Sequence, residues 1–107
     1  MNITACLIFI LAALLEIGGD AVIRMGLRGR GAVFIALGFL LLGTYGVVVN
    51  TIQWDFSRLL GVYVAVFAVI SVLWGCFIFK EQIPVSTWIG LGVIVLGGMI
   101  IQFGHPQ

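Results

Sequence analysis

Long apolar runs, separated by short polar connections, make up most of this chain. Three of the runs carry no charged residue, and each is close to the ~20 residues that cross a bilayer as an α-helix. They are residues 31–54, 59–79 and 82–104. The first run is shorter, and it reaches full length only when it continues through Glu16 and Asp20 to Met25. The predicted helices occupy residues 3–25, 31–52, 59–79 and 86–104, and together they form an all-α transmembrane domain over residues 1–107.

The basic residues are distributed unevenly between the connections. The first and third connections, with the helix ends beside them, hold Arg24, Arg28, Arg30 and Lys80. The connection on the opposite side holds only Arg58. Loops rich in Lys and Arg stay in the cytoplasm, so we expect these two connections inside the cell and both termini outside. The expected location is the bacterial inner membrane.

Composition excludes most other classes of protein. The chain is 63% hydrophobic and 8% charged, whereas a soluble domain carries about 25% charged residues. Low charge and high hydrophobicity also exclude intrinsic disorder. A net charge of +1 provides no basic surface for nucleic acid. The sequence contains no phosphate-binding loop, metal-ligand cluster or nucleophile–base pattern, so we expect neither an enzyme nor a bound cofactor or metal.

Three charged residues in the first helix are the most informative feature. Glu16, Asp20 and Arg24 are four residues apart, which places them on roughly one helix face. Asp20 and Arg24 can pair near the interface and form a gate or a second charge pair. Glu16 lies near mid-span, where a charge costs about 2.5–3.5 kcal/mol. It can be a protonated structural contact or a site for protons and cations, and the functional role of most intramembrane acids favours the second reading.

Other polar side chains are weaker candidates for a substrate site. Tyr63 in the third helix provides an aromatic wall suited to a lipophilic cation through cation–π attraction. Thr44 and Tyr45, Asn50 and Ser71 can line a cavity, or their polar groups can bond the backbone of their own helix.

Glycine spacing suggests close helix contacts. Gly31 and Gly38 are seven residues apart, as are Gly90 and Gly97, so each pair shares a helix face. Such faces let helices approach closely in lipid. Two interpretations stay open: packing within the chain, or a dimer contact along the fourth helix.

These residues resemble the small multidrug resistance transporters and the related YnfA-type membrane proteins of the drug/metabolite transporter superfamily. Glu16 followed by Gly19 and Arg24 is similar to the glutamate, glycine and basic residue of that family's first helix. The segment GCFIFKE at residues 75–81 resembles the end of its third helix, and residues 88–98 resemble its fourth. The similarity covers nearly the whole chain.

The resemblance implies a dimer in which paired copies of Glu16 bind protons or a cationic substrate in turn and so drive export. Tyr63 falls where the family places an aromatic residue facing the substrate. The implied partners are a small cationic substrate, protons, membrane lipid and a second copy or paralogue of the chain, arranged parallel or antiparallel.

Two alternatives to the exporter stay open. The fourth helix is also similar to four-span subunits that flip lipid-linked or amphipathic metabolites, but those usually lack the glutamate of the first helix. The other alternative is an assembly subunit without transport activity.

Overall fold

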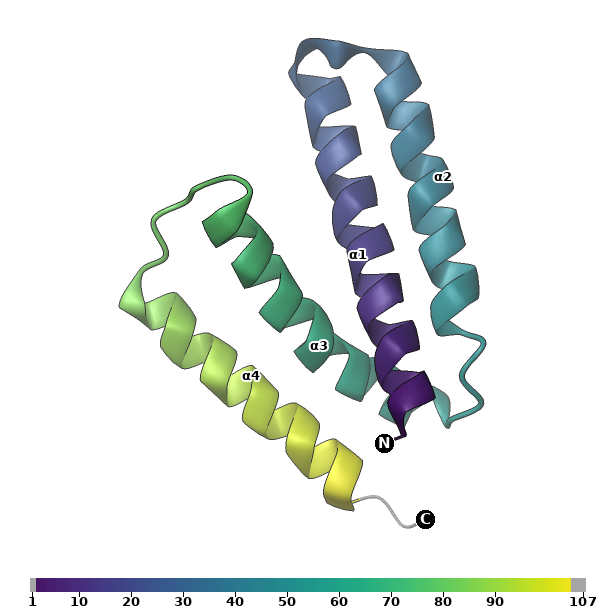
Figure 1. Ribbon diagram of the computed structural model, residues 1–107, viewed down its shortest axis with the longest axis vertical. Coiled ribbons are helices and arrows are strands. Elements are labelled where there is room, and N and C mark those ends of the chain that lie inside the picture. The colour runs from purple at the N-terminus through teal and green to yellow at the C-terminus, as the bar shows by residue number, and fades with distance from the viewer. Residues whose placement is uncertain (1, 105–107) are drawn as a thin grey trace. The chain divides into compact units, whose positions relative to one another are not determined.

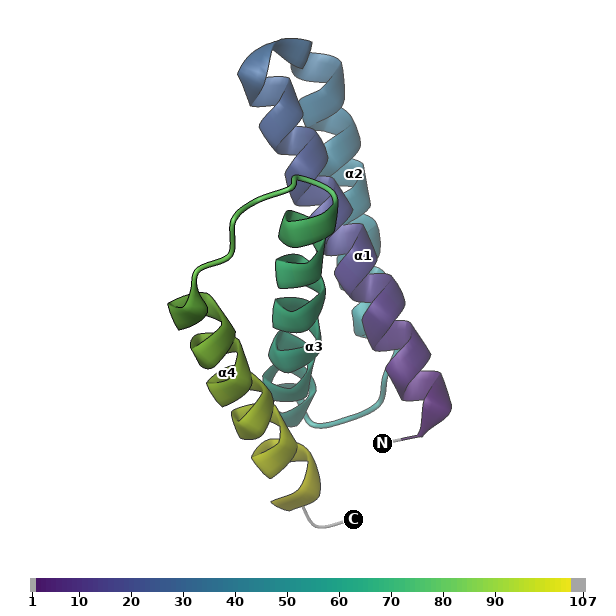
Figure 2. The same ribbon diagram turned by 60° about the vertical axis from the view of Figure 1, so that its left-hand side comes forward.

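Four long helices form the computed structural model, which describes residues 2–104 (Figures 1 and 2). They are α1 (Ile3–Met25), α2 (Ala32–Val49), α3 (Phe56–Phe77) and α4 (Val85–Gly104). All four are long and apolar enough to cross a membrane, and the described residues contain no β-strand. The expected all-α fold with four membrane-spanning helices is confirmed.

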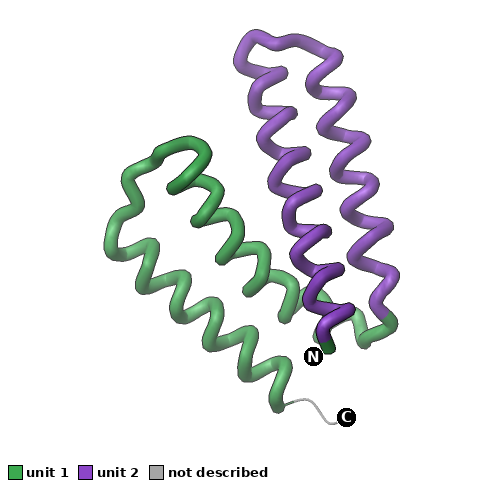
Figure 3. The backbone as a smooth tube through the Cα atoms, viewed as in Figure 1, with its two compact units in different colours: residues 1–2, 53–107 green, residues 3–52 purple. Residues whose placement is uncertain are grey.

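The helices fall into two compact units (Figure 3). One unit is Ile3–Ile52 and contains the antiparallel pair α1 and α2. The other runs from Gln53 onward and contains the antiparallel pair α3 and α4. Each unit is a helical hairpin, and the single domain expected from the sequence stays a prediction.

A wide turn, η1 (Gly26–Arg30), connects α1 to α2 at the expected connection. Gly29 and Gly31 have φ angles of 118° and 93°, values that glycine adopts without steric cost. The Gly31 N–H donates to the Gly26 carbonyl oxygen at 3.1 Å and closes the turn. The α2 helix ends at Val49, three residues before the expected end. The N–H groups of Thr51 and Ile52 donate to carbonyl oxygens three residues before them, which is turn geometry.

In the second hairpin, α3 begins three residues earlier than expected. Asp55 is extended at φ −57° and ψ 141°, as an N-cap residue is, and its carbonyl oxygen accepts the Leu59 N–H at 2.8 Å. Arg58 therefore lies in the first helical turn and not in a connection. The sequence places Arg58 in the loop because a charge marks the edge of an apolar run.

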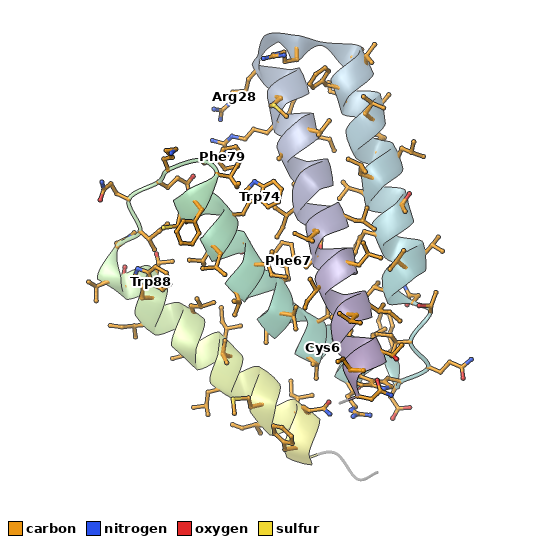
Figure 4. All side chains as sticks on the ribbon, viewed as in Figure 1. Cys6, Arg28, Phe67, Trp74, Phe79 and Trp88 are labelled. Carbon is orange, nitrogen blue, oxygen red and sulfur yellow. The ribbon has the colours of Figure 1, made fainter. Side chains whose placement is uncertain are left out.

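The other end of this hairpin is a non-helical connection. Lys80 has a φ of 55°, and the Glu81 N–H donates back to the Gly75 carbonyl oxygen at 2.9 Å. These features terminate α3 at Phe77, two residues before the expected end, and α4 begins at Val85, one residue before the expected start. The side chains of Trp74, Phe79 and Trp88 flank this connection (Figure 4). Such aromatic residues are typical of the membrane–water interface.

The hairpin of α1 and α2 packs through glycine. A Cβ atom added to Gly38 would lie 2.8 Å from the Gly19 carbonyl oxygen and would overlap the Ile23 side chain. A Cβ atom added to Gly19 would lie 3.1 Å from the Gly38 carbonyl oxygen. The two backbones therefore touch at a point where only glycine fits. Close packing of this kind holds helices together in lipid, where no hydrophobic effect drives them together.

The glycines of α4 differ from one another in whether they contact α3. A Cβ atom added to Gly90 or Gly97 would meet nothing within 4 Å, whereas one added to Gly98 would meet Ala65 on α3. Within the described chain, packing inside the hairpin accounts for Gly38 and Gly98 but not for Gly90 and Gly97.

We predict that Gly38→Ala destabilises the hairpin of α1 and α2 by about 1–3 kcal/mol, the usual cost of overpacking. Gly43→Ala on the same helix is the matched control, since a Cβ there meets nothing within 4 Å. The control should be neutral or slightly stabilising, because alanine favours the helix. Unfolding of both variants in dodecyl sulfate, followed by circular dichroism, measures the difference. Equal stability of the two variants would contradict the glycine contact.

Candidate functional site

Glu16 lies near the middle of α1 and is half-buried. Its charge acts on the hydroxyl of Tyr45, a half-buried residue of α2 in the same hairpin. An acidic and a phenolic side chain thus face each other across the two helices. A carboxylate can accept a hydrogen bond from a phenol, which makes Tyr45 a suitable partner for Glu16 in either protonation state.

The packing of the hairpin explains why these two side chains meet. The tightest contacts pair Gly26 with Ile35, Ile23 with Gly38, and Gly19 with Leu42. Each step of three or four residues toward the start of α1 matches an equal step toward the end of α2. The next step pairs Glu16 with Tyr45. The step after that pairs Ala12 with Val49, which are both almost completely buried.

The residues of α1 one turn before and one turn after Glu16 are small and apolar. Ala12 and Ala13 lie one turn before it and Gly19 one turn after it, and all three are buried. None of these side chains can solvate a charge. Tyr45, a bound proton or a bound cation can each stabilise a carboxylate at this position.

The other charges of α1 are more accessible. Asp20 and Arg24, one and two turns beyond Glu16, are both exposed in the chain. Their position toward the η1 turn agrees with a location nearer the membrane surface than Glu16. Their proposed pairing as a gate or second charge pair stays a prediction.

Tyr63 is buried, with 3% of its surface exposed, and its ring centroid lies 6.1 Å from that of Phe67 at an angle of 45°. Both aromatic residues belong to α3 in the second hairpin. The expected role of Tyr63 as an aromatic wall beside Glu16 stays a prediction.

The remaining polar candidates bond their own helix or turn. The Thr44 hydroxyl donates to the Leu40 carbonyl oxygen at 2.8 Å, and the Ser71 hydroxyl donates to the Ala68 carbonyl oxygen at 3.0 Å. The Asn50 amide donates to the Gly46 carbonyl oxygen at 2.8 Å. Local backbone bonds thus satisfy these groups, as one of the two sequence readings expects. Contact with a substrate stays a prediction for all three.

Tyr45 is the residue whose importance the sequence does not reveal. In the sequence it is one of several polar residues of the second helix, with no spacing that connects it to Glu16. The register of the hairpin supplies that connection, and it depends on which glycines touch. The described residues contain no group of three His, Cys, Asp or Glu side chains that could hold a metal ion.

Comparison with known proteins places these features in a wider group. Residues 2–106 match a family model described as "Uncharacterised BCR, YnfA/UPF0060 family". A UPF0060 membrane protein of Staphylococcus carnosus is 39% identical over 98 residues, which are 90% of each chain. A UPF0060 membrane protein of Desulfitobacterium hafniense is 32% identical over 98% of this chain and 99% of its own. The UPF0060 membrane protein YfjF of Bacillus subtilis is 31% identical over 96% of each chain. No solved structure matches this chain.

We predict that cysteines placed at residues 16 and 45 can be joined by a short bifunctional maleimide. The variant carries Glu16→Cys and Tyr45→Cys in a background without Cys6 and Cys76. The matched control pairs Glu16→Cys with Thr44→Cys, because Thr44 is exposed and points about 100° away from Tyr45 around α2. Mass spectrometry of the linked peptides should show efficient linkage only for the first pair. Preferential linkage to residue 44 would mean that the register is wrong.

Proposed function

Because the chain belongs to the YnfA/UPF0060 family of bacterial membrane proteins, we propose that it is a proton-coupled exporter of small cationic or lipophilic compounds. In this proposal Glu16 is the site that protons and substrate share. The resemblance to YnfA-type proteins is confirmed by the family match. The wider relationship to small multidrug resistance transporters is part of the proposal.

One observation carries the proposal: an acidic side chain lies at mid-span on α1 and interacts electrostatically with Tyr45 of α2. A negative charge at this depth costs several kcal/mol unless something neutralises it. A proton neutralises the carboxylate, and so does a bound cation. The two cannot occupy the same carboxylate together, so substrate binding releases the proton. This exclusion is the elementary step of an exchange of protons for cations.

Tyr45 has a positioning role in this scheme. Its hydroxyl can donate a hydrogen bond to the carboxylate when Glu16 is charged, and its oxygen can accept a hydrogen bond from the carboxyl O–H when Glu16 is neutral. Its ring also offers a face to the positive charge of a cation, a cation–π interaction worth about 0.5–2 kcal/mol. The same side chain thus serves both occupants of the site.

We further propose that the exporter is a dimer of this chain, or of this chain with a paralogue. One hairpin can surround Glu16 on only part of its circumference, and an exported compound needs a path with walls on all sides. The open glycine face of α4 at Gly90 and Gly97 supports close approach of a second chain.

The test is proton movement in proteoliposomes that contain a pH-sensitive dye. A panel of quaternary ammonium compounds supplies the cations, since these carry no proton of their own. The wild-type protein should move protons against the flow of at least one compound. Glu16→Gln should abolish this coupling while leaving insertion and helical content unchanged, because an amide cannot exchange a proton for a cation. Glu16→Asp should retain partial activity with a changed pH dependence, since the carboxylate remains at a shorter reach.

The matched control is Glu81→Gln, the same chemical change in the exposed connection before α4. This variant should transport as the wild type does. Coupled transport by Glu16→Gln at the wild-type rate would remove Glu16 from the mechanism and contradict the proposal.

A further inference from the structure

An apolar groove of about 460 Å³ lies between α3 and α4. Valines of α3 line one side: Val62, Val66 and Val69. Residues of α4, among them Val95, Met99 and Phe103, line the other. The floor is where α3 and α4 touch, since a Cβ atom added to Gly98 would lie 2.5 Å from the Ala65 side chain. Figure 2 shows α4 coming nearer to α3 toward the C-terminal end of α4.

One polar residue, Gln102, lines the groove and is itself 5% exposed. Its side-chain oxygen accepts a hydrogen bond from the Arg58 guanidinium at 3.1 Å. Arg58 also stacks on the Trp54 ring, with 3.9 Å between the guanidinium carbon and the ring centroid. A positive charge held in place by an amide and an aromatic ring therefore lies next to the groove, bonded to one of its lining residues.

The hydrogen-bonding capacity of Arg58 is incompletely used. The bond to Gln102 occupies one of several guanidinium N–H donors. The Nε atom is buried and has no hydrogen-bond partner in the described part of the chain. A buried donor without a partner is destabilising, so an anion that engages the remaining guanidinium donors is favoured. Phosphate is a particularly good match, because guanidinium binds it through two parallel hydrogen bonds.

The groove and Arg58 together match the depth of one leaflet. Arg58 lies in the first turn of α3, near the expected membrane surface. The residues of α3 that line the groove run from Val62 to Val69, a rise of about 10 Å at 1.5 Å per residue, and Arg58 lies about 6 Å further toward the start of the helix. Half of a bilayer's hydrocarbon core is about 15 Å. A lipid with its phosphate at Arg58 can therefore place an acyl chain along the groove.

From these observations we infer that the groove binds one acyl chain of an anionic phospholipid whose phosphate contacts Arg58. Charge selects the headgroup, and the apolar walls select a molecule with a hydrocarbon chain attached to it. Gln102 positions the guanidinium next to the groove. This site lies entirely within the second hairpin and does not depend on Glu16 or on transport activity.

The test uses the full-length protein in a non-ionic detergent with phosphatidylglycerol or phosphatidylcholine of identical acyl chains. Native mass spectrometry counts the bound lipids. Both lipids offer a phosphate to Arg58, but the choline ammonium of phosphatidylcholine cancels the headgroup charge and is repelled by the guanidinium. The wild type should therefore prefer phosphatidylglycerol by about fivefold, the factor expected from one charge contact exposed to water. Arg58→Gln should abolish this preference. Glycerol phosphate, which lacks acyl chains, should not compete at concentrations equal to the lipid.

Matched variants separate this site from general attraction of anionic lipid to a cationic protein. Arg28→Gln removes an equal charge from the exposed η1 turn (Figure 4) and should keep the wild-type preference. Arg58→Lys, which keeps the charge but loses the planar fork, should retain an intermediate preference. Val69→Phe narrows the groove without a change of charge and should reduce binding of both lipids.

Three results would overturn the inference. The first is equal binding of the two lipids by the wild type. The second is an unchanged preference in Arg58→Gln, or an equal loss in Arg28→Gln. The third is a fall in bound phosphatidylglycerol as the protein dimerises, because a second copy of the chain would then occupy the groove.

Discussion

The contact between Gly19 and Gly38 determines most of what the first hairpin can do. The absence of side chains at these two positions lets the backbones of α1 and α2 touch. A contact between two backbones fixes both the rotation of each helix and their relative shift along the hairpin. Once rotation and shift are fixed, the residue of α2 opposite Glu16 is also fixed, and it is Tyr45. A bulkier residue at either glycine would move the two polar side chains apart without changing either of them.

The two hairpins follow one physical rule. In hydrocarbon a polar side chain must find a polar partner, and the partner in each hairpin comes from the opposite helix. Glu16 interacts with Tyr45 across α1 and α2, and Arg58 bonds Gln102 across α3 and α4. Small residues bring the helices close enough for each pair: the two glycines in the first hairpin, and Ala65 with Gly98 in the second. Each pair places a charged side chain beside a neutral polar group, and each is a proposed site of ligand binding.

Apolar length and the cost of charge in a membrane are sufficient to predict four helices and to select Glu16 from the sequence. The start of α3 is not predicted, because Arg58 resembles a loop residue until its stacking on Trp54 and its bond to Gln102 are known. Gln102 itself looks like an incidental polar residue near the end of an apolar run. The pairing of Tyr45 with Glu16 is missed for a different reason: a helix-to-helix register is set by three-dimensional contacts and leaves no spacing signal in the sequence. The hydrogen bonds from the side chains of Thr44, Asn50 and Ser71 to nearby backbone carbonyl groups, by contrast, can be expected from the sequence. Side chains of these types commonly form such bonds.

Proton release on ligand binding is the most direct measurement of the central claim that protons and cations share Glu16. A quaternary ammonium compound would be titrated into detergent-solubilised protein in unbuffered solution while the pH is recorded. The account predicts acidification that saturates with binding at no more than one proton per copy of Glu16, and none in Glu16→Gln. Saturable binding without proton release at any pH, or equal release by the glutamine variant, would contradict it.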